Sequence, residues 1–310
     1  MTALVTGASG FVGCWLTATL AADGIPVVAQ MRGAPSALFC RLGLVDHPQV
    51  TPVIDPDVTG AVARAVPNMV YHLAGFSQIG AAMQNPLTVY EANARTTWTL
   101  LEALRCHAPA ARCVLASTDS LYGETGGQAV TEEAPLRAQG PYETSKHMAE
   151  LAAVSFARTY GLPVTIARLG NVYGPGDANG ARIIPGIAAA VRAGVPPQLR
   201  GGGRAVRALL NVMDCIAGLR LLAARAGEPG IAGTAFNLSG DPPMTTLEIA
   251  QTALRAFGRP DLHPVITDDA PGETSVKISN ADRLRALGWA PQISLSQGLA
   301  GVMADWGRDA

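Results

Sequence analysis

The feature that most constrains this chain is a glycine-rich stretch at its start, Ala3-Leu-Val-Thr-Gly7-Ala-Ser-Gly10-Phe-Val-Gly13. The apolar run before Gly7 predicts a buried first strand, and the apolar spacing from Phe11 onward predicts a helix that stops at Gly24. Gly7 would allow the tight turn between them, Gly10 a close approach to a pyrophosphate, and Gly13 close packing of helix on strand. The positive helix N-terminus would then hold the phosphates. In this context the spacing predicts a dinucleotide site rather than a merely structural turn, formed by Gly7, Ser9, Gly10, Phe11, Val12 and Gly13.

Length and composition narrow the class of protein. A chain of 310 residues can bury a large core as one extended or two coupled domains. The net charge of −1 gives no electrostatic reason to expect nucleic acid or an anionic membrane as partner, and no apolar run approaches the length of a membrane span. The five cysteines show no metal-ligand spacing. We therefore expect a cytoplasmic protein with free thiols and no bound metal.

The second predicted strand bears on the choice of cofactor. It spans Ile25–Met31, and in an NAD site the end of this strand usually carries an acid that binds the adenosine ribose. Here the strand ends in Ala-Gln-Met and Arg32 follows. A guanidinium forms paired charge-assisted hydrogen bonds with a 2′-phosphate. The sequence thus predicts an NAD(P) site with NADP somewhat favoured over NAD, the alternative being an ordinary exposed loop arginine at 32.

Two further strand ends supply candidate cofactor contacts. A short strand that begins at Pro52 ends in Asp55, and either Asp55 or Asp57 is placed to touch adenine, although aspartate is also common in ordinary turns. The segment 69–75 reads as a strand that closes on small residues. Small residues at this point would let the backbone at Leu73 and Ala74 pass close to the cofactor.

Two polar residues lie inside apolar elements. We interpret His72 as a buried structural histidine rather than a catalytic base, because it lies within a predicted core strand. Asn93 lies within a long helix predicted over residues 86–108, and an amide that turns inward there must find backbone partners.

Candidate catalytic groups follow. A predicted strand at 113–116 runs into Ser117-Thr118-Asp119-Ser120, and open α/β sheets bind their ligands at such carboxyl strand ends. Tyr142 and Lys146 lie four residues apart, which places both on one face of the next predicted helix. A nearby ammonium favours the phenolate and lowers the pKa of the tyrosine. A chance pairing is easily met in any helix, but together with the dinucleotide turn the pair indicates catalysis.

The order of elements predicts an α/β fold: a Rossmann-type, doubly wound parallel sheet with a smaller C-terminal α/β substrate domain. We expect the NAD(P)-binding domain over residues 1–170 and the substrate domain over 171–310, with interleaved segments and part of the second returning to the sheet. Within 171–310 the pattern predicts helices at 182–193 and 247–257 and a strand at 235–238.

The motifs resemble the extended short-chain dehydrogenase/reductase family. The matching segments cover nearly the whole chain and are Gly7–Gly13, His72–Gly75, Asn93, Ser117-Thr118, Tyr142 with Lys146, Asn171–Gly176, Arg207 with Asp214, and Leu287–Pro291. The chain is most similar to the NDP-sugar epimerases, 4,6-dehydratases and 4-ketosugar reductases of that family. Gly10–Leu16 and Gly170–Pro185 resemble proteins around CDP-glucose 4,6-dehydratase. Pro271–Glu273 and Gly288-Trp289 look equally like GDP-sugar dehydratases and reductases.

The resemblance implies roles for the catalytic candidates. Thr118 and Tyr142 would hydrogen-bond the 4-oxygen of the sugar, and Tyr142 would take or return its proton. Lys146 would hold the nicotinamide ribose and tune the tyrosine. Asp119 would protonate the departing 6-hydroxyl in a dehydration.

The resemblance also implies an NDP-sugar substrate and a self-association. Ser77, Asn171 and Arg207 would face the sugar nucleotide, with Arg207 on the pyrophosphate. Related enzymes usually dimerise through two long helices, here Asn93–His107 and Tyr142–Tyr160, so we expect a homodimer.

One departure from the pattern bears on the reaction. In the related 4,6-dehydratases the strand-end motif resembles Thr-Asp-Glu or Thr-Asp-Lys, whereas this chain has Ser120 at the third position. A serine without a partner has no useful basicity near neutral pH, so the dedicated base for the sugar C5 proton is missing. We therefore expect 4-epimerisation through a 4-keto sugar slightly ahead of 4,6-dehydration and of NADPH-dependent 4-keto reduction. A Rossmann-type cofactor sensor is the non-enzyme alternative.

Overall fold

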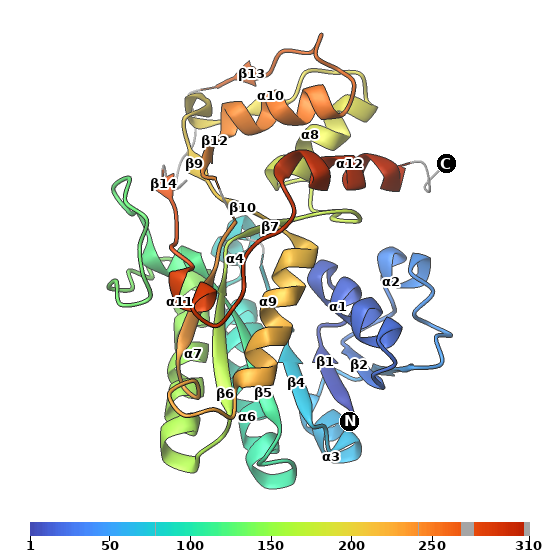
Figure 1. Ribbon diagram of the computed structural model, residues 1–310, viewed down its shortest axis with the longest axis vertical. Helices are drawn as coiled ribbons and strands as arrows, with labels where there is room; N and C mark the ends of the chain where they lie inside the picture. Colours follow the sequence, from blue (N-terminus) through green and yellow to red (C-terminus); the bar gives the residue numbers. More distant parts are fainter. Residues whose placement is uncertain (78, 241, 268–275, 307–310) are drawn as a thin grey trace. The chain divides into compact units, whose positions relative to one another are not determined.

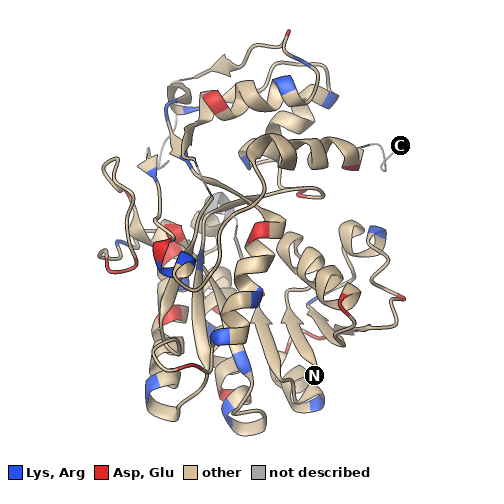
Figure 2. Ribbon diagram, viewed as in Figure 1, with Lys and Arg blue, Asp and Glu red and all other residues tan. Residues whose placement is uncertain are grey.

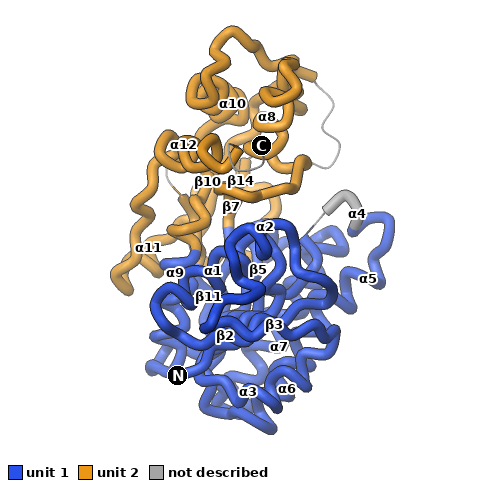
Figure 3. The backbone as a smooth tube through the Cα atoms, turned by 90° about the vertical axis from the view of Figure 1, so that its right-hand side faces the viewer, with its two compact units in different colours: residues 1–121, 136–169, 216–236 blue, residues 122–135, 170–215, 237–310 orange. Residues whose placement is uncertain are grey.

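The computed structural model describes residues 1–77, 79–240, 242–267 and 276–306 (Figure 1). The chain divides into two compact units (Figure 3). Unit 1 comprises residues 1–121, 136–169 and 216–236, and unit 2 comprises 122–135, 170–215 and 237–310. Segment 122–135 precedes residue 170 but belongs to unit 2, and segment 216–236 follows it but belongs to unit 1. The sequence predicts such interleaving, with a later part of the chain returning to the sheet, and residues 216–236 lead into a strand at the edge of the unit 1 sheet.

Unit 1 is built on a seven-stranded sheet with the order β11-β6-β5-β4-β1-β2-β3. Its strands are β1 (Ala3–Thr6), β2 (Val27–Met31), β3 (Val50–Ile54), β4 (Met69–His72), β5 (Arg112–Thr118), β6 (Val164–Leu169) and β11 (Ala235–Leu238). Strands β1 to β6 pair in parallel. The strand order reverses between β1 and β4, where Thr6 pairs with His72. The predicted doubly wound sheet is confirmed, and open α/β sheets generally bind their ligands at such a switch point.

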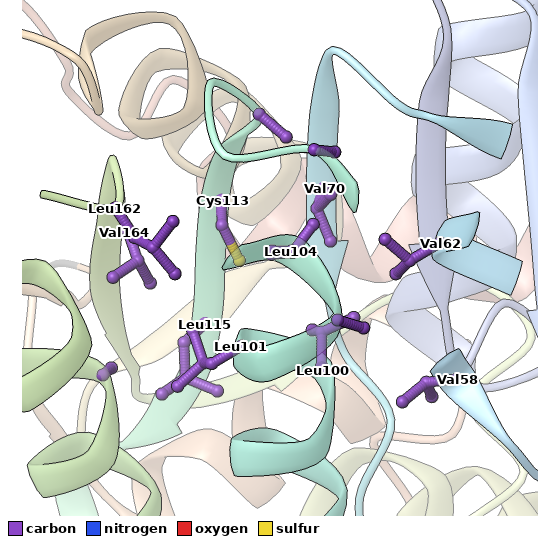
Figure 4. Packing of buried hydrophobic residues seen from close by; sticks show 14 of the residues in the cluster. Val58, Val62, Val70, Leu100, Leu101, Leu104, Cys113, Leu115, Leu162 and Val164 are labelled. Carbon is purple, nitrogen blue, oxygen red and sulfur yellow. The ribbon is translucent and has the colours of Figure 1, made fainter. Parts of the chain in front are cut away.

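Helices cover both faces of the sheet. They are α1 (Phe11–Ala22), α2 (Ala37–Arg41), α3 (Val58–Ala65), α4 (Ile79–Gln84), α5 (Pro86–Tyr90), α6 (Thr96–His107), α7 (Pro141–Tyr160) and α9 (Val212–Arg225), with a 3₁₀ turn at Asp119–Tyr122. Apolar side chains of α3, α6 and α7 form one core with those of β4, β5 and β6 (Figure 4). Over the other face, Arg220 of α9 hydrogen-bonds to Asp23 just beyond α1 (Figure 1).

The long helix predicted over residues 86–108 forms over residues 86–107, but its helical repeat changes part of the way along. Between α5 and α6 the chain forms one π-helical turn, Glu91–Arg95, which contains Asn93. A π turn adds a residue to the helical repeat and so changes which side chains face inward. Asn93 is almost fully buried there, with 1% of its surface exposed.

Unit 2 contains short strands and three longer helices. Its strands are β7 (Asn171–Tyr173), β8 (Gln198–Leu199), β9 (Val206–Arg207), β10 (Leu209–Asn211), β12 (Met244–Thr245), β13 (Val265–Ile266) and β14 (Val276–Lys277). Its helices are α8 (Ile183–Arg192), α10 (Thr246–Ala256), α11 (Asp282–Arg285) and α12 (Leu295–Trp306), with a 3₁₀ turn at Gly201–Gly203. Apolar residues of α8, α10 and α12 share one core. Thr245 is the N-cap of α10 and forms a capping box with Glu248.

Charged residues of both signs are interspersed over the helices and loops of each unit (Figure 2), in keeping with the net charge of −1. Within the described ranges, no helix combines the length and the apolar character needed to cross a bilayer.

Candidate active site

The glycine-rich turn between β1 and α1 has the geometry of a phosphate cradle. Gly7 has a φ of +69°, and a Cβ atom placed on it would lie 2.7 Å from the backbone nitrogen of Ala74. Helix α1 begins after Gly10, with no capping side chain and no acidic residue in its first turn. The backbone N–H groups of Phe11, Val12 and Gly13 therefore lack intrahelical partners. The turn fits a cofactor pyrophosphate, because it offers free donors and a positive helix end.

The loop after β4 lies against this turn. The backbone N–H of Leu73 donates to the Thr6 carbonyl at 3.2 Å, and that of Ala74 donates to the Thr6 hydroxyl oxygen, also at 3.2 Å. Leu73 and Ala74 are half-buried. The structure thus brings these two predicted cofactor residues together with Gly7, although they are far apart in the sequence.

The residues predicted to bind the adenosine end of the cofactor are Arg32 and Asp55. Arg32 is exposed directly after β2, in the place predicted for it. The Asp55 carboxylate accepts a hydrogen bond from the backbone N–H of Asp57 at 2.9 Å and pairs with Arg64 at 3.2 Å. The Asp57 N–H and the Arg64 guanidinium hold the pKa of Asp55 below its usual value. Asp55 thus has a local turn role, and its contact with adenine stays a prediction.

The predicted catalytic groups lie on β5, the turn after it, and α7. Thr118 ends β5 and is buried, and its hydroxyl oxygen accepts the backbone N–H of Ser120 at 3.1 Å. Asp119 follows and is also buried. On α7, Tyr142 and Lys146 are each 8% exposed. The Lys146 ammonium donates to the Ala116 carbonyl of β5 at 2.9 Å, which joins α7 to the strand that carries Thr118.

Burial changes the acid–base behaviour of Lys146. The loss of hydration lowers its pKa from 10.5 to about 8, and the nearby Glu150 carboxylate opposes this shift. At neutral pH Lys146 therefore remains mainly protonated, as is needed to stabilise a tyrosine phenolate. Glu150 is itself buried in an ion pair with Arg168 of β6, at 2.7 Å.

Asn93 clamps two parts of the site together, a role that its pattern only hinted at. Its side-chain oxygen accepts the backbone N–H of Phe76 at 2.7 Å, and its amide donates to the Phe76 carbonyl at 3.1 Å and to the Ser145 hydroxyl at 2.8 Å. Ser145 in turn donates to the Tyr142 carbonyl. Asn93 thus ties the loop after β4 to the first turns of α7. The expected backbone partners are found, while Ser145 had no signal beyond its place between Tyr142 and Lys146.

Gly75 completes this arrangement. A Cβ atom at Gly75 would lie 2.6 Å from the Asn93 side-chain oxygen and 3.2 Å from the Lys146 ammonium. The loop backbone therefore passes directly beside both groups, so that residue 75 must lack a side chain.

The predicted substrate residues fall in both units. Ser77 is exposed in unit 1. In unit 2, Asn171 begins β7 and pairs with Leu209 of β10. Arg207 lies in β9 and pairs in register with Lys277 of β14, which places the two cationic side chains on the same face of this small sheet. Pro271–Glu273, part of the resemblance to GDP-sugar enzymes, lies outside the described residues.

No group of three or more His, Cys, Asp or Glu residues in the described part of the chain is arranged to hold a metal ion. The five cysteines are free thiols.

We predict that Gly7→Ala weakens NADH and NADPH binding by at least about tenfold, because a side chain at positive φ is strained and its Cβ would strike the Ala74 backbone. Gly24→Ala is the matched control, since Gly24 has a φ of +73° with nothing within 4 Å of the added carbon. Fluorescence titration of the reduced cofactors measures both variants. Equal, undiminished affinities in the two folded proteins would contradict the close approach.

We also predict that Lys146→Met flattens the dependence of stability on alkaline pH. The pKa of Lys146 is about 8 in the folded protein against 10.5 in the ordinary side chain. The unfolded state therefore binds more protons between these values, and the free energy of unfolding gains from this residue as the pH rises through that window. Urea unfolding across the window compares the two proteins, and identical slopes would show that Lys146 is not the source.

Comparison with known proteins now supplies the family. A family model described as "NAD dependent epimerase/dehydratase family" matches residues 3–239. The chain is 30% identical to dTDP-glucose 4,6-dehydratase of Streptomyces griseus over 97% of its own length and 92% of that protein. It is 29% identical to UDP-glucose 4-epimerase of Mycolicibacterium smegmatis, covering 97% and 96% of the two chains.

Solved structures of such enzymes have the same fold as this chain. The dTDP-glucose 4,6-dehydratase of Streptomyces venezuelae, with NAD and TYD bound, superposes with a TM-score of 0.88 at 28% identity, over 100% of this chain and 98% of that one. The UDP-glucuronic acid 4-epimerase of Bacillus cereus shares the fold, with a TM-score of 0.90 at 23% identity and full coverage of both chains. The chain therefore belongs to the NAD-dependent epimerase/dehydratase family, the sugar-nucleotide enzymes of the extended short-chain dehydrogenases/reductases.

Proposed function

We propose that this enzyme converts an NDP-hexose through a 4-keto intermediate, with 4-epimerisation as the net reaction. Tyr142 and Lys146 on one face of α7 support the oxidoreductive step. Bound NAD(P), held at the Gly7–Gly13 turn, would supply the acceptor and donor of hydride at the sugar C4.

The hydrogen bonds of the resting site leave the needed donors free for substrate. The Thr118 hydroxyl oxygen accepts from Ser120, so that its proton is left to donate to the sugar 4-oxygen. The Lys146 ammonium has three N–H donors and uses one on Ala116, which leaves two for ribose hydroxyls. Tyr142 would take the proton of the 4-hydroxyl and later return it.

Ser120 is the observation that carries the choice of reaction. It lies in the 3₁₀ turn directly after Thr118 and Asp119, where a dehydratase would need a basic residue to remove the C5 proton. A serine hydroxyl has far lower basicity at neutral pH than the Glu or Lys side chain expected there, so it is a poor candidate for that base. Chemistry at C4 alone needs only Thr118, Tyr142 and Lys146, all of which are present.

The second candidate is 4,6-dehydration, and two observations favour it. Asp119, the residue that would protonate the departing 6-hydroxyl, is present and only 3% exposed. Several of the relatives at 29–30% identity are dTDP-glucose 4,6-dehydratases.

The two reactions differ in their products. We predict that purified protein incubated with dTDP-, UDP-, CDP- and GDP-hexoses, without added cofactor, forms a 4-epimer that NMR of the sugar can identify. A 4-keto-6-deoxy product would overturn epimerisation in favour of dehydration. Turnover of a 4-keto sugar only when NADPH is added would instead identify a reductase.

Tyr142→Phe tests the catalytic role directly. We expect kcat to fall by a factor of about 10² to 10⁴, the usual contribution of a positioned proton donor and acceptor. Tyr160→Phe is the control, because Tyr160 ends the same helix and is 55% exposed. Unchanged turnover in Tyr142→Phe would remove this residue from the mechanism.

We further propose that the cofactor site accepts NADP through Arg32. None of the five residues of β2 is acidic, and Arg32 follows at its exposed end. The structures of related dehydratases carry NAD, so NAD binding is the expected background. We predict that Arg32→Ala weakens NADP binding by about tenfold, the effect of losing a charge-assisted pair, with little change for NAD. Equal losses for both cofactors in calorimetric titrations would exclude recognition of the 2′-phosphate.

On the substrate side we propose that Asn171, Arg207 and Ser77 bind the NDP-sugar. The adjacent cations Arg207 and Lys277 support a pyrophosphate at β9. We also propose a homodimer through α6 and α7, where Trp98 and Leu151 are exposed at 41% and 58%. The cytoplasmic location expected from the thiols stays a prediction.

A further inference from the structure

A buried chain of hydrogen bonds runs from the dinucleotide turn to the π turn of the Asn93 clamp. Thr6 Oγ1 and His72 Nδ1 are 2.7 Å apart, and His72 Nε2 and Thr97 Oγ1 are 3.1 Å apart. Thr97 Oγ1 then donates to the Asn93 carbonyl at 2.7 Å. All four residues are at most 2% exposed.

These hydrogen bonds are compatible with only one arrangement of protons. The single hydroxyl proton of Thr97 is used on the Asn93 carbonyl, so Thr97 must accept from His72 and Nε2 must carry a hydrogen. His72 Nδ1 then accepts the Thr6 hydroxyl proton, while the Thr6 oxygen accepts the Ala74 N–H. Burial, together with the nearby Lys146 ammonium, lowers the pKa of His72 to about 3. The imidazole is therefore neutral and held in the Nε2–H tautomer.

The two ends of this series of hydrogen bonds lie at the two parts of the proposed site, the cofactor turn and the first turns of α7. Thr6 precedes Gly7 and holds Ala74, which lies against the phosphate turn. At the other end, the π turn sets the Asn93 amide, which holds Phe76 and Ser145 next to the catalytic pair. The histidine lies between them and touches neither Tyr142 nor Lys146 by any hydrogen bond in the described structure.

We propose that His72 is a positioning residue, which through Thr97 fixes the π turn of Asn93 and so aligns α7 with the cofactor turn. This inference rests on the proposed oxidoreductive function of the Tyr142–Lys146 pair. A purely structural histidine would need only to be buried with its hydrogen bonds satisfied. Here, in addition, turnover requires the hydrogen on Nε2 of His72.

Thr97→Val tests the link without changing the size of the side chain. We expect kcat to fall by about tenfold or more, since small displacements of catalytic groups have effects of this order. The dissociation constant for NADH should stay close to that of the wild type, because Thr6 and Ala74 keep their contacts. Thr97→Ser restores the hydroxyl and should restore kcat, and Thr99→Val on the same helix is the matched control. A folded Thr97→Val enzyme with wild-type kcat would overturn the proposal.

Two substitutions of His72 distinguish the role of Nε2 from that of Nδ1. The amide nitrogen of glutamine reaches the position of Nε2, whereas that of asparagine reaches only the position of Nδ1. His72→Gln should therefore retain more of kcat than His72→Asn, by about tenfold if the Thr97 bond is the one that matters. Equal kcat values in the two folded variants, or the reverse order, would overturn the role of Nε2.

Nitrogen-15 NMR of the histidine side chains tests the arrangement without any substrate. One of the five histidines should show the Nε2–H tautomer and no titration from neutral to mildly acidic pH, and its signal should be absent in His72→Gln. A titrating His72, or an Nδ1–H tautomer, would overturn the proposal. This measurement and the NADH titration hold even if no NDP-hexose is turned over, so failure of the proposed reaction is distinguishable from failure of the inference.

Discussion

The close approach of the Gly7 backbone to Ala74 is the contact on which the rest of the candidate site depends. It joins the ends of β1 and β4, the two strands between which the sheet reverses its order. A side chain at Gly7 would push the loop after β4 away from the phosphate turn. The same loop continues past Gly75 to Phe76, where Asn93 holds it to α7. One backbone contact thus begins a path that reaches the catalytic helix.

The protonation states of Lys146 and His72 follow from the burial of these two side chains. Burial lowers the pKa of Lys146 to about 8 but leaves this side chain mainly protonated at neutral pH. His72 is buried still deeper and stays neutral. A second cation there would oppose protonation of Lys146, and hence the stabilisation of a phenolate at Tyr142. Burial therefore keeps one positive charge, in the position where the proposed chemistry needs it.

Local sequence patterns were sufficient to predict features that depend on a single helix, strand or turn. The strand–turn–helix at Gly7–Gly13 and the helix that carries Tyr142 and Lys146 follow from residue type and spacing alone. The sequence pattern did not reveal a feature that involves long-range contacts. The helix predicted over 86–108 forms over residues 86–107, but it contains a π turn, in which the Asn93 amide finds its partners at Phe76 and Ser145, distant in sequence.

The sequence by itself determined the doubly wound sheet, the glycine-rich turn after β1 and the placement of Tyr142 and Lys146 on one helix, since each depends on periodicity or on local spacing. Only the tertiary structure decided the surroundings of these groups. The burial that shifts the pKa of Lys146 and the single tautomer of His72 both arise from residues that are far apart in the sequence. Local spacing cannot encode such contacts, because they depend on strand order and register.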